Sequence, residues 1–192
     1  MKDLYIIAGP NGAGKTTASY TILPEIFNCE EFVNADEIAK GLSPFNPDTV
    51  AIQSGRMMLE RINYLLLNDI SFAIETTLST KRYTSLIKKA KIKGYAITLL
   101  FLSLDSVELA ISRVVMRVKE GGHNIPKDVI ERRFTKGLKN FFNLYVPIVD
   151  RWLLINNSEK EFITIARGSI NGILFVENKS IWNQLKKMYH DN

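Results

Sequence analysis

The stretch GPNGAGKTT, residues 9–17, constrains the fold more than any other part of the chain, and it follows directly on the apolar run LYIIA. Gly9, Gly14, Lys15 and Thr16 fit the pattern G-x-x-x-x-G-K-[ST]. Glycines in this pattern allow backbone N–H groups to turn inward around a phosphate, and the helix that begins in the turn adds the positive end of its dipole. A buried strand before the turn and a helix after it are the required context, so we predict a nucleoside triphosphate site.

The side chains of this turn predict specific contacts with ATP or GTP. Lys15 is expected to reach the β- and γ-phosphates, and the Thr16 hydroxyl to ligate Mg²⁺. An accidental glycine turn is the alternative, and the match of both motif and context argues against it. The predicted nucleotide-binding residues are Gly9, Pro10, Asn11, Gly12, Ala13, Gly14, Lys15, Thr16 and Thr17.

The rest of the chain predicts a single α/β domain. Its 192 residues, 46% of them hydrophobic, are enough for one sizeable core. Short apolar runs alternate with segments of helical period, which indicates a mostly parallel sheet with helices on both faces. We predict a P-loop NTPase fold of the nucleotide-kinase type: a three-layer sandwich with a mostly parallel five-stranded sheet, an arginine-bearing helical lid at about 113–133, and a C-terminal β-hairpin plus helix at about 162–190.

The individual elements follow from the same patterns. The first helix is expected to end before Pro24, Pro126 to open a helix that runs to about Asn143, and Asn171-Gly172 to form a hairpin turn. Strands are predicted at 4–8, 30–36, 71–76, 96–104 and 152–156, and further helices at 46–68, 84–94, 105–120 and 179–189. Two of these helices are amphipathic, and their apolar side chains are predicted to face the core. They are Val107, Ala110, Ile111, Val114, Val115 and Val118 in the helix at 105–120, and Ile181, Trp182, Leu185, Met188 and Tyr189 in the helix at 179–189.

Composition argues against several classes of protein. Cys29 is the one cysteine, and His123 and His190 are the two histidines, so neither a disulfide nor a Cys- or His-rich metal site is expected. The net charge is +5, but the basic residues are scattered and not interleaved with aromatic residues, so we do not expect nucleic-acid binding. The chain has no apolar stretch of membrane-spanning length and no apparent signal peptide, so we expect a cytoplasmic protein that does not bind membranes.

Two acidic residues are predicted at the carboxyl ends of strands, where open α/β sheets bind ligands. Asp36 is expected to end the second strand, where it can orient or deprotonate an acceptor hydroxyl, or else cap the following helix. Glu75 is expected to end the third strand, where it can support Mg²⁺ through water or contact a substrate hydroxyl, or else point into solvent. Thr76 and Thr77 beside it can add substrate contacts.

A basic lid is predicted around the break at Gly121-Gly122, which we expect to act as a hinge. Such a lid can close over the transferring phosphoryl group, stabilise its charge and exclude water. The alternative is a solvated helix face in which Glu120 and Glu131 pair with the arginines. Adjacent helical residues point about 100° apart, so one member of the second arginine pair is expected to face the cleft. The four candidate lid arginines are Arg113, Arg117, Arg132 and Arg133.

Four segments together resemble the compact zeta-toxin-like P-loop kinases: GPNGAGKTT, NADEIAKGLSPFNP, SFAIETTLS and GGHNIPKDVIERRF. The resemblance covers roughly residues 4–135. Zeta toxins of this family phosphorylate the 3′-hydroxyl of UDP-N-acetylglucosamine. The resemblance implies that Asp36 is the catalytic base, that Glu75 lies in the sugar-nucleotide pocket, and that Arg117 and Arg133 clamp phosphate. By the same analogy the chain has an antitoxin as a protein partner.

These observations predict a Mg²⁺-dependent kinase that uses ATP or GTP and a small-molecule acceptor. Its catalytic residues are expected to be Lys15, Asp36, Arg117 and Arg133. A sugar nucleotide such as UDP-N-acetylglucosamine is the acceptor that the resemblance implies, and a nucleoside or an antibiotic are alternatives. A non-catalytic nucleotide-binding regulator is a further alternative, which would not need a base at Asp36.

Overall fold

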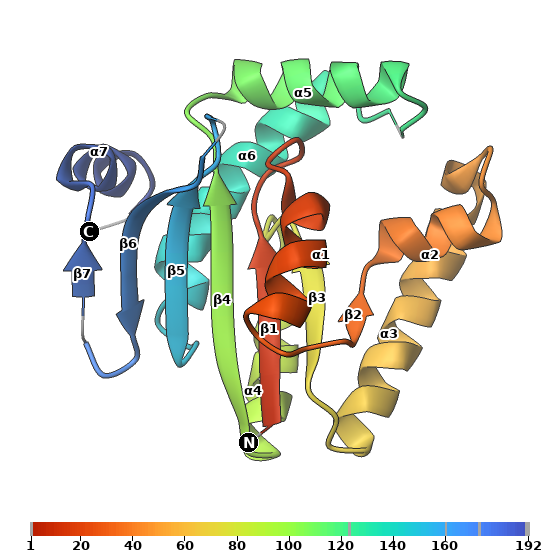
Figure 1. The fold of residues 1–192 in the computed structure, drawn as a ribbon, viewed down its shortest axis with the longest axis horizontal. Helices are drawn as coiled ribbons and strands as arrows, with labels where there is room; N and C mark the ends of the chain where they lie inside the picture. The colour runs from red at the N-terminus through yellow and green to blue at the C-terminus, as the bar shows by residue number, and fades with distance from the viewer. Residues whose placement is uncertain (1, 123, 160, 173, 191–192) are drawn as a thin grey trace.

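A computed structural model describes residues 2–122, 124–159, 161–172 and 174–190 (Figure 1). These residues form one seven-stranded sheet in the order β2-β3-β1-β4-β5-β6-β7. The first five strands in this order run parallel, and β6 and β7 continue the sheet antiparallel. The strands are β1 (Lys2–Ala8), β2 (Phe32–Val33), β3 (Phe72–Thr76), β4 (Tyr95–Ser103), β5 (Arg151–Asn156), β6 (Ile163–Ser169) and β7 (Leu174–Val176).

The helices cover the sheet and close its upper edge in Figure 1. In that view α1 lies in front of the sheet, α4 and α6 lie behind it, and α5 crosses above the carboxyl ends of the strands. None of the helices formed by the described residues is long and apolar enough to cross a membrane. The helices are α1 (Lys15–Glu25), α2 (Ala35–Leu42), α3 (Ala51–Leu67), α4 (Tyr83–Ile92), α5 (Val107–Lys119), α6 (Lys127–Asn140) and α7 (Lys179–Tyr189), with a 3-10 turn at Pro47–Val50 and a π-helical turn at Phe141–Tyr145.

The predicted α/β fold with a mostly parallel sheet is confirmed, and the C-terminal hairpin extends the sheet beyond the five predicted strands. The run 4–8 of β1 is buried on both faces, as is typical of a central parallel strand. Its last residue, Ala8, pairs with Thr76 of β3 and Phe101 of β4. The turn that follows β1 therefore lies between the carboxyl ends of β3 and β4.

Two predicted boundaries were wrong. The strand predicted at 30–36 ends at Val33, because the Asn34 side chain accepts a hydrogen bond from the Asp36 N–H and caps α2. Asp36 therefore lies in the first turn of a helix rather than at the end of a strand. α1 also does not stop before Pro24 but includes it, one residue before the helix ends. The carbonyl that loses its partner there belongs to Tyr20, which is exposed and can bond water.

Each of the two predicted apolar faces contains one residue that is exposed. In α5, Ala110 and Val114 are buried, Val107, Ile111 and Val118 pack partly buried against the core, and Val115 is half exposed. In α7, Met188 is exposed and Trp182 is the buried residue.

Candidate active site

The turn between β1 and α1 has the backbone geometry of a phosphate cradle. Gly9, Gly12 and Gly14 have φ angles of 145°, 78° and 75°, which side chains with a Cβ rarely adopt. A Cβ at Gly9 would also collide with the Leu102 carbonyl oxygen. Gly14 is the N-cap residue of α1 and has no side chain to accept the first N–H groups of the helix. Those groups are therefore available to an anion.

Lys15 is held over this turn as a buried ammonium, with 7% of the residue exposed. Its Nζ donates to the Pro10 carbonyl at 3.0 Å and lies 3.7 Å from Glu75 Oε1. Burial lowers the pKa of Lys15, while the Glu75 and Asp36 carboxylates act in the opposite direction. A cation that is already desolvated and weakly partnered is well suited to bind a phosphate that enters the turn.

Glu75 links the turn to the neighbouring strand. Its Oε2 accepts a hydrogen bond from Thr16 Oγ1 and another from Asn34 Nδ2, both at 2.8 Å. Thr16 belongs to α1 and Asn34 follows β2, so the carboxylate at the end of β3 is contacted from both sides of its strand.

The oxygen atoms of Thr16 and Glu75 fit Mg²⁺, which prefers oxygen ligands and commonly takes one or two from the protein and the others from water and phosphate. Among the described residues, no cluster of three or more His, Cys, Asp or Glu side chains could hold a metal ion. The donor set therefore fits an ion shared with a nucleotide rather than one held by the protein alone.

Asp36 lies where three cavities meet. One cavity of about 670 Å³ follows the glycine turn and α1, and a second of about 290 Å³ is lined by Thr76, Thr77 and Arg133. Lys15, Asp36 and Glu75 line both cavities, so they stand at the boundary between a nucleotide-sized space and a smaller one. A third cavity, of about 470 Å³, extends from Asp36 toward α2 and the end of α5.

The four candidate lid arginines have different environments. Arg117 lines the 670 Å³ and 470 Å³ cavities, and Arg133 lines the 290 Å³ cavity with Nη1 at 3.4 Å from Asn11 Oδ1. Burial lowers the pKa of Arg133, with the Asp36 carboxylate acting in the opposite direction. Arg132, its neighbour on α6, is exposed. Two of the four therefore approach the phosphate turn from separate helices.

Arg113 has a different partner from the one expected of a lid arginine. Although it borders the 670 Å³ cavity, its guanidinium donates to the carbonyl oxygens of Asn157 and Ser158, each at 2.7 Å. Asn157 Nδ2 in turn donates to the Ala13 carbonyl of the glycine turn at 2.8 Å. Arg113 thus connects α5 to the loop after β5, and Asn157 supports the turn from behind.

The predicted hinge at Gly121-Gly122 forms the C-terminal cap of α5. Gly121 has a φ of 86°, and the Gly122 N–H donates to the Arg117 carbonyl at 2.8 Å. A Cβ on Gly122 would lie 2.6 Å from Arg117 Cγ and 2.8 Å from Arg117 O. The backbone at Gly122 therefore packs closely against Arg117. Residue 123 of the predicted lid lies outside the described residues.

Sequence reasoning missed two residues of this site, Asn34 and Asn157. Asn34 lies inside the NAD segment that was interpreted as a strand end, and an N-cap pattern could have identified it. Asn157 follows the predicted strand WLLIN, and its contact with the turn joins residues 144 positions apart. No local signal reveals such a contact.

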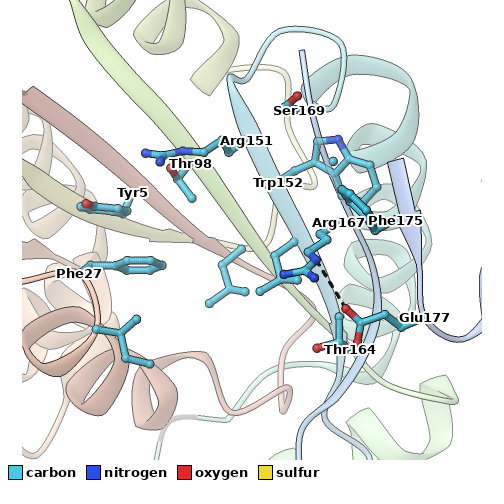
Figure 2. Close-up of a pocket in the computed structure, with 14 residues that line it drawn as sticks. Tyr5, Phe27, Thr98, Arg151, Trp152, Thr164, Arg167, Ser169, Phe175 and Glu177 are labelled. Carbon is cyan, nitrogen blue, oxygen red and sulfur yellow. Dashed lines mark ion pairs between the residues drawn. The ribbon is translucent and has the colours of Figure 1, made fainter. Parts of the chain in front are cut away.

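A larger cavity, of about 710 Å³, lies on the sheet near the first residue of β5 and the end of α1 (Figure 2). Its two arginines are paired with carboxylates. Arg167 lies 3.5 Å from Glu177, which also lines the cavity (Figure 2), and Arg151 lies 3.4 Å from Asp3. It contains neither a glycine turn nor a helix N-terminus. We therefore place the candidate active site at the phosphate turn.

Comparisons with known proteins show which family this chain resembles. The family model described as zeta toxin matches residues 1–166. An uncharacterized protein of Haemophilus influenzae is 31% identical over 129 residues, which are 66% of this chain and 88% of that protein.

Two solved structures share the fold at lower identity. A chain of the AvrRxo1-ORF1:ORF2 complex with ATP is 20% identical with a TM-score of 0.75, over 96% of this chain and 63% of that one. A chain from the PezAT toxin–antitoxin system of Streptococcus pneumoniae is 16% identical with a TM-score of 0.71, over 100% of this chain and 80% of that one. The chain thus spans less than two thirds of the AvrRxo1 chain that it matches.

Proposed function

This chain belongs to the zeta toxin family of P-loop kinase-like proteins, and we propose that it is a kinase that transfers the γ-phosphoryl group of ATP or GTP to a hydroxyl of a small molecule. One observation carries the proposal: Lys15, Asp36 and Glu75 stand together where the 670 Å³ cavity meets the 290 Å³ cavity. A group bound in the first cavity can therefore be transferred to a group bound in the second.

The nucleotide side of the site is built by the glycine turn and α1. Backbone N–H groups of the glycine turn and of the N-terminus of α1 would surround the phosphates, and Lys15 would leave the Pro10 carbonyl to contact them. Thr16 and Glu75 would hold Mg²⁺, which when bound neutralises charge on the β- and γ-phosphates.

The acceptor side is built around Asp36. Its carboxylate would take the proton of the acceptor hydroxyl as that oxygen bonds to the γ-phosphorus and the bond to the leaving nucleoside diphosphate breaks. Arg117 and Arg133 would stabilise the charge on the transferring group from opposite sides. Glu75, Thr76 and Thr77 would contact the acceptor in the 290 Å³ cavity.

UDP-N-acetylglucosamine or a related sugar nucleotide is our proposed acceptor. The hydroxyl-rich lining of the 290 Å³ cavity suits a sugar, and the adjoining 470 Å³ cavity, which shares Asp36, offers further space along α2. An antitoxin is our proposed protein partner, because a chain of similar fold comes from the PezAT toxin–antitoxin system.

The test is a transfer assay with γ-labelled ATP or GTP, Mg²⁺ and UDP-N-acetylglucosamine, run beside the same assay with a metabolite extract. We expect a labelled product, whose identification names the acceptor. Nucleotide binding without a labelled product in either assay would overturn the kinase proposal and favour a nucleotide-binding regulator.

A further inference from the structure

We propose that Asn34 is a positioning residue of this site, whose one side-chain amide orients Glu75 toward Thr16 and fixes the helix turn that carries Asp36. The inference rests on the proposed function and adds a residue to its machinery. Asn34 is buried, with 6% of the residue exposed, and it lies between β2 and α2.

Both ends of the Asn34 amide are engaged, and its orientation follows from the chemistry of its partners. Nδ2 donates to Glu75 Oε2 at 2.8 Å, and Oδ1 accepts from the Asp36 N–H at 2.8 Å. A carboxylate accepts and an N–H donates, so the opposite amide orientation would place two acceptors together at Glu75 and two donors together at the Asp36 N–H. The side chain therefore joins the Glu75 carboxylate to the Asp36 backbone in one rigid bridge.

Sheet order explains why Glu75 needs this bridge. β3 lies between β2 and β1, so Asn34 approaches the Glu75 carboxylate from one side and Thr16 from the other. A Thr16 hydroxyl that ligated Mg²⁺ through an oxygen lone pair could keep donating its proton to Glu75 Oε2, so Thr16 and Asn34 would hold this oxygen from two sides. Asn34 would thereby keep the carboxylate directed at Thr16 rather than rotated toward Lys15, whose Nζ lies 3.7 Å from Glu75 Oε1.

The capping role and the positioning role can be separated by one substitution. Serine is as good an N-cap residue as asparagine, but it has no amide donor and is too short to reach Glu75. Asn34→Ser therefore keeps the cap of α2 and removes the bond to Glu75. Asn178→Ser is the matched control, because the Asn178 side chain caps α7 through the Ile181 N–H at 3.1 Å, and α7 lies beside β6 at the far edge of the sheet.

The experiment is calorimetric binding of ATP with and without Mg²⁺, for wild type and both variants. We expect Asn34→Ser to keep the Mg²⁺-free affinity within a few-fold of wild type. The gain in affinity that Mg²⁺ provides should fall about 10- to 100-fold, the usual effect of removing a residue that orients a metal ligand. Asn178→Ser should keep both values. Asn34→Ser also loses a buried hydrogen bond to a carboxylate, so it should unfold at a lower temperature than Asn178→Ser, but the Mg²⁺-dependent gain is a ratio of two affinities measured on the same folded variant.

A double-mutant cycle with Glu75→Gln tests whether Asn34 acts through Glu75. In the Glu75→Gln background, Asn34→Ser should have no further effect on the Mg²⁺-dependent gain. A full additional loss in that background, or an unchanged gain in the single variant, overturns the inference and leaves the proposed function intact. Wild-type protein that binds neither Mg²⁺–ATP nor Mg²⁺–GTP overturns both.

Discussion

Replacing Lys15 by methionine should weaken nucleotide binding without lowering the stability of the nucleotide-free protein. The ammonium is buried, and its described contacts are a carbonyl at 3.0 Å and a carboxylate oxygen at 3.7 Å, beyond hydrogen-bond distance. Such weak partnering offsets only part of the cost of removing the charge from water, and burial accordingly lowers the pKa of Lys15. Glu75 keeps its hydrogen bonds from Thr16 and Asn34 when the ammonium is removed, so its carboxylate is not left without donors. Methionine has a similar length and carries no charge. We expect Lys15→Met to be at least as stable as wild type in the absence of nucleotide at neutral pH.

The pH dependence of this difference follows from the direction of the pKa shift. Because the pKa of Lys15 in the folded state lies below the ordinary lysine value of 10.5, the unfolded chain binds more protons between those two values. The free energy of unfolding of wild type should therefore rise with pH across that window. The stability advantage of Lys15→Met should be largest below the folded pKa and disappear as pH approaches about 10.5.

Nucleotide binding should change in the opposite direction. A hydrogen bond to a charged group contributes about 1.5–3 kcal/mol, so loss of the Lys15–phosphate contact should weaken ATP affinity about 10- to 100-fold. Calorimetry measures this affinity, and thermal unfolding without nucleotide measures stability. Lys2→Met is the control, since Lys2 pairs with Asp69 at 2.8 Å at the other end of β1. Unchanged ATP affinity in Lys15→Met would refute the assignment of the phosphate turn.

Three further predictions concern the acceptor side and the lid. Asp36→Asn should keep nucleotide affinity within a few-fold, while single-turnover transfer falls by about two to four orders of magnitude; wild-type rates would exclude Asp36 as the base. Gly122→Ala should displace Arg117, because its Cβ would lie 2.8 Å from the Arg117 carbonyl, and should lower transfer, whereas Gly55→Ala, whose Cβ would meet nothing within 4 Å, should not. Amide exchange at 113–122 and 124–133 should slow when nucleotide and acceptor bind, and equal exchange in both states would contradict a closing lid.

The phosphate turn could be predicted from sequence because all its determinants are local. The strand LYIIA, the three glycines at positive φ and Lys15 lie within a dozen consecutive residues. The position of Asp36 could not be predicted in the same way. A two-residue strand is too short to leave a periodic signal, and the Asn34 cap turned the chain into a helix where alternation favoured a strand.

The hydrogen-bond partners of Glu75 could not be predicted from local sequence patterns. Its carboxylate accepts from side chains 59 and 41 positions away, and it meets them because β3 lies between β1 and β2. The arginines show the same limit. Arg113 and Arg117 are one helical turn apart, and the sequence does not distinguish them. In the structure, however, Arg113 donates to the carbonyl oxygens of Asn157 and Ser158, which the tertiary fold brings beside it.

The same sheet order explains how one carboxylate can serve both sides of the proposed reaction. A residue at the end of β1 would reach only the phosphate turn, and one at the end of β2 only α2. Glu75 ends the strand between them, within hydrogen-bond distance of Thr16 on one side and Asn34 on the other. Any change that rotates this carboxylate must therefore alter a contact with α1 and a contact with the cap of α2 together. For this reason we expect Glu75 variants to impair nucleotide and acceptor binding jointly, and Asp36 variants to impair transfer alone.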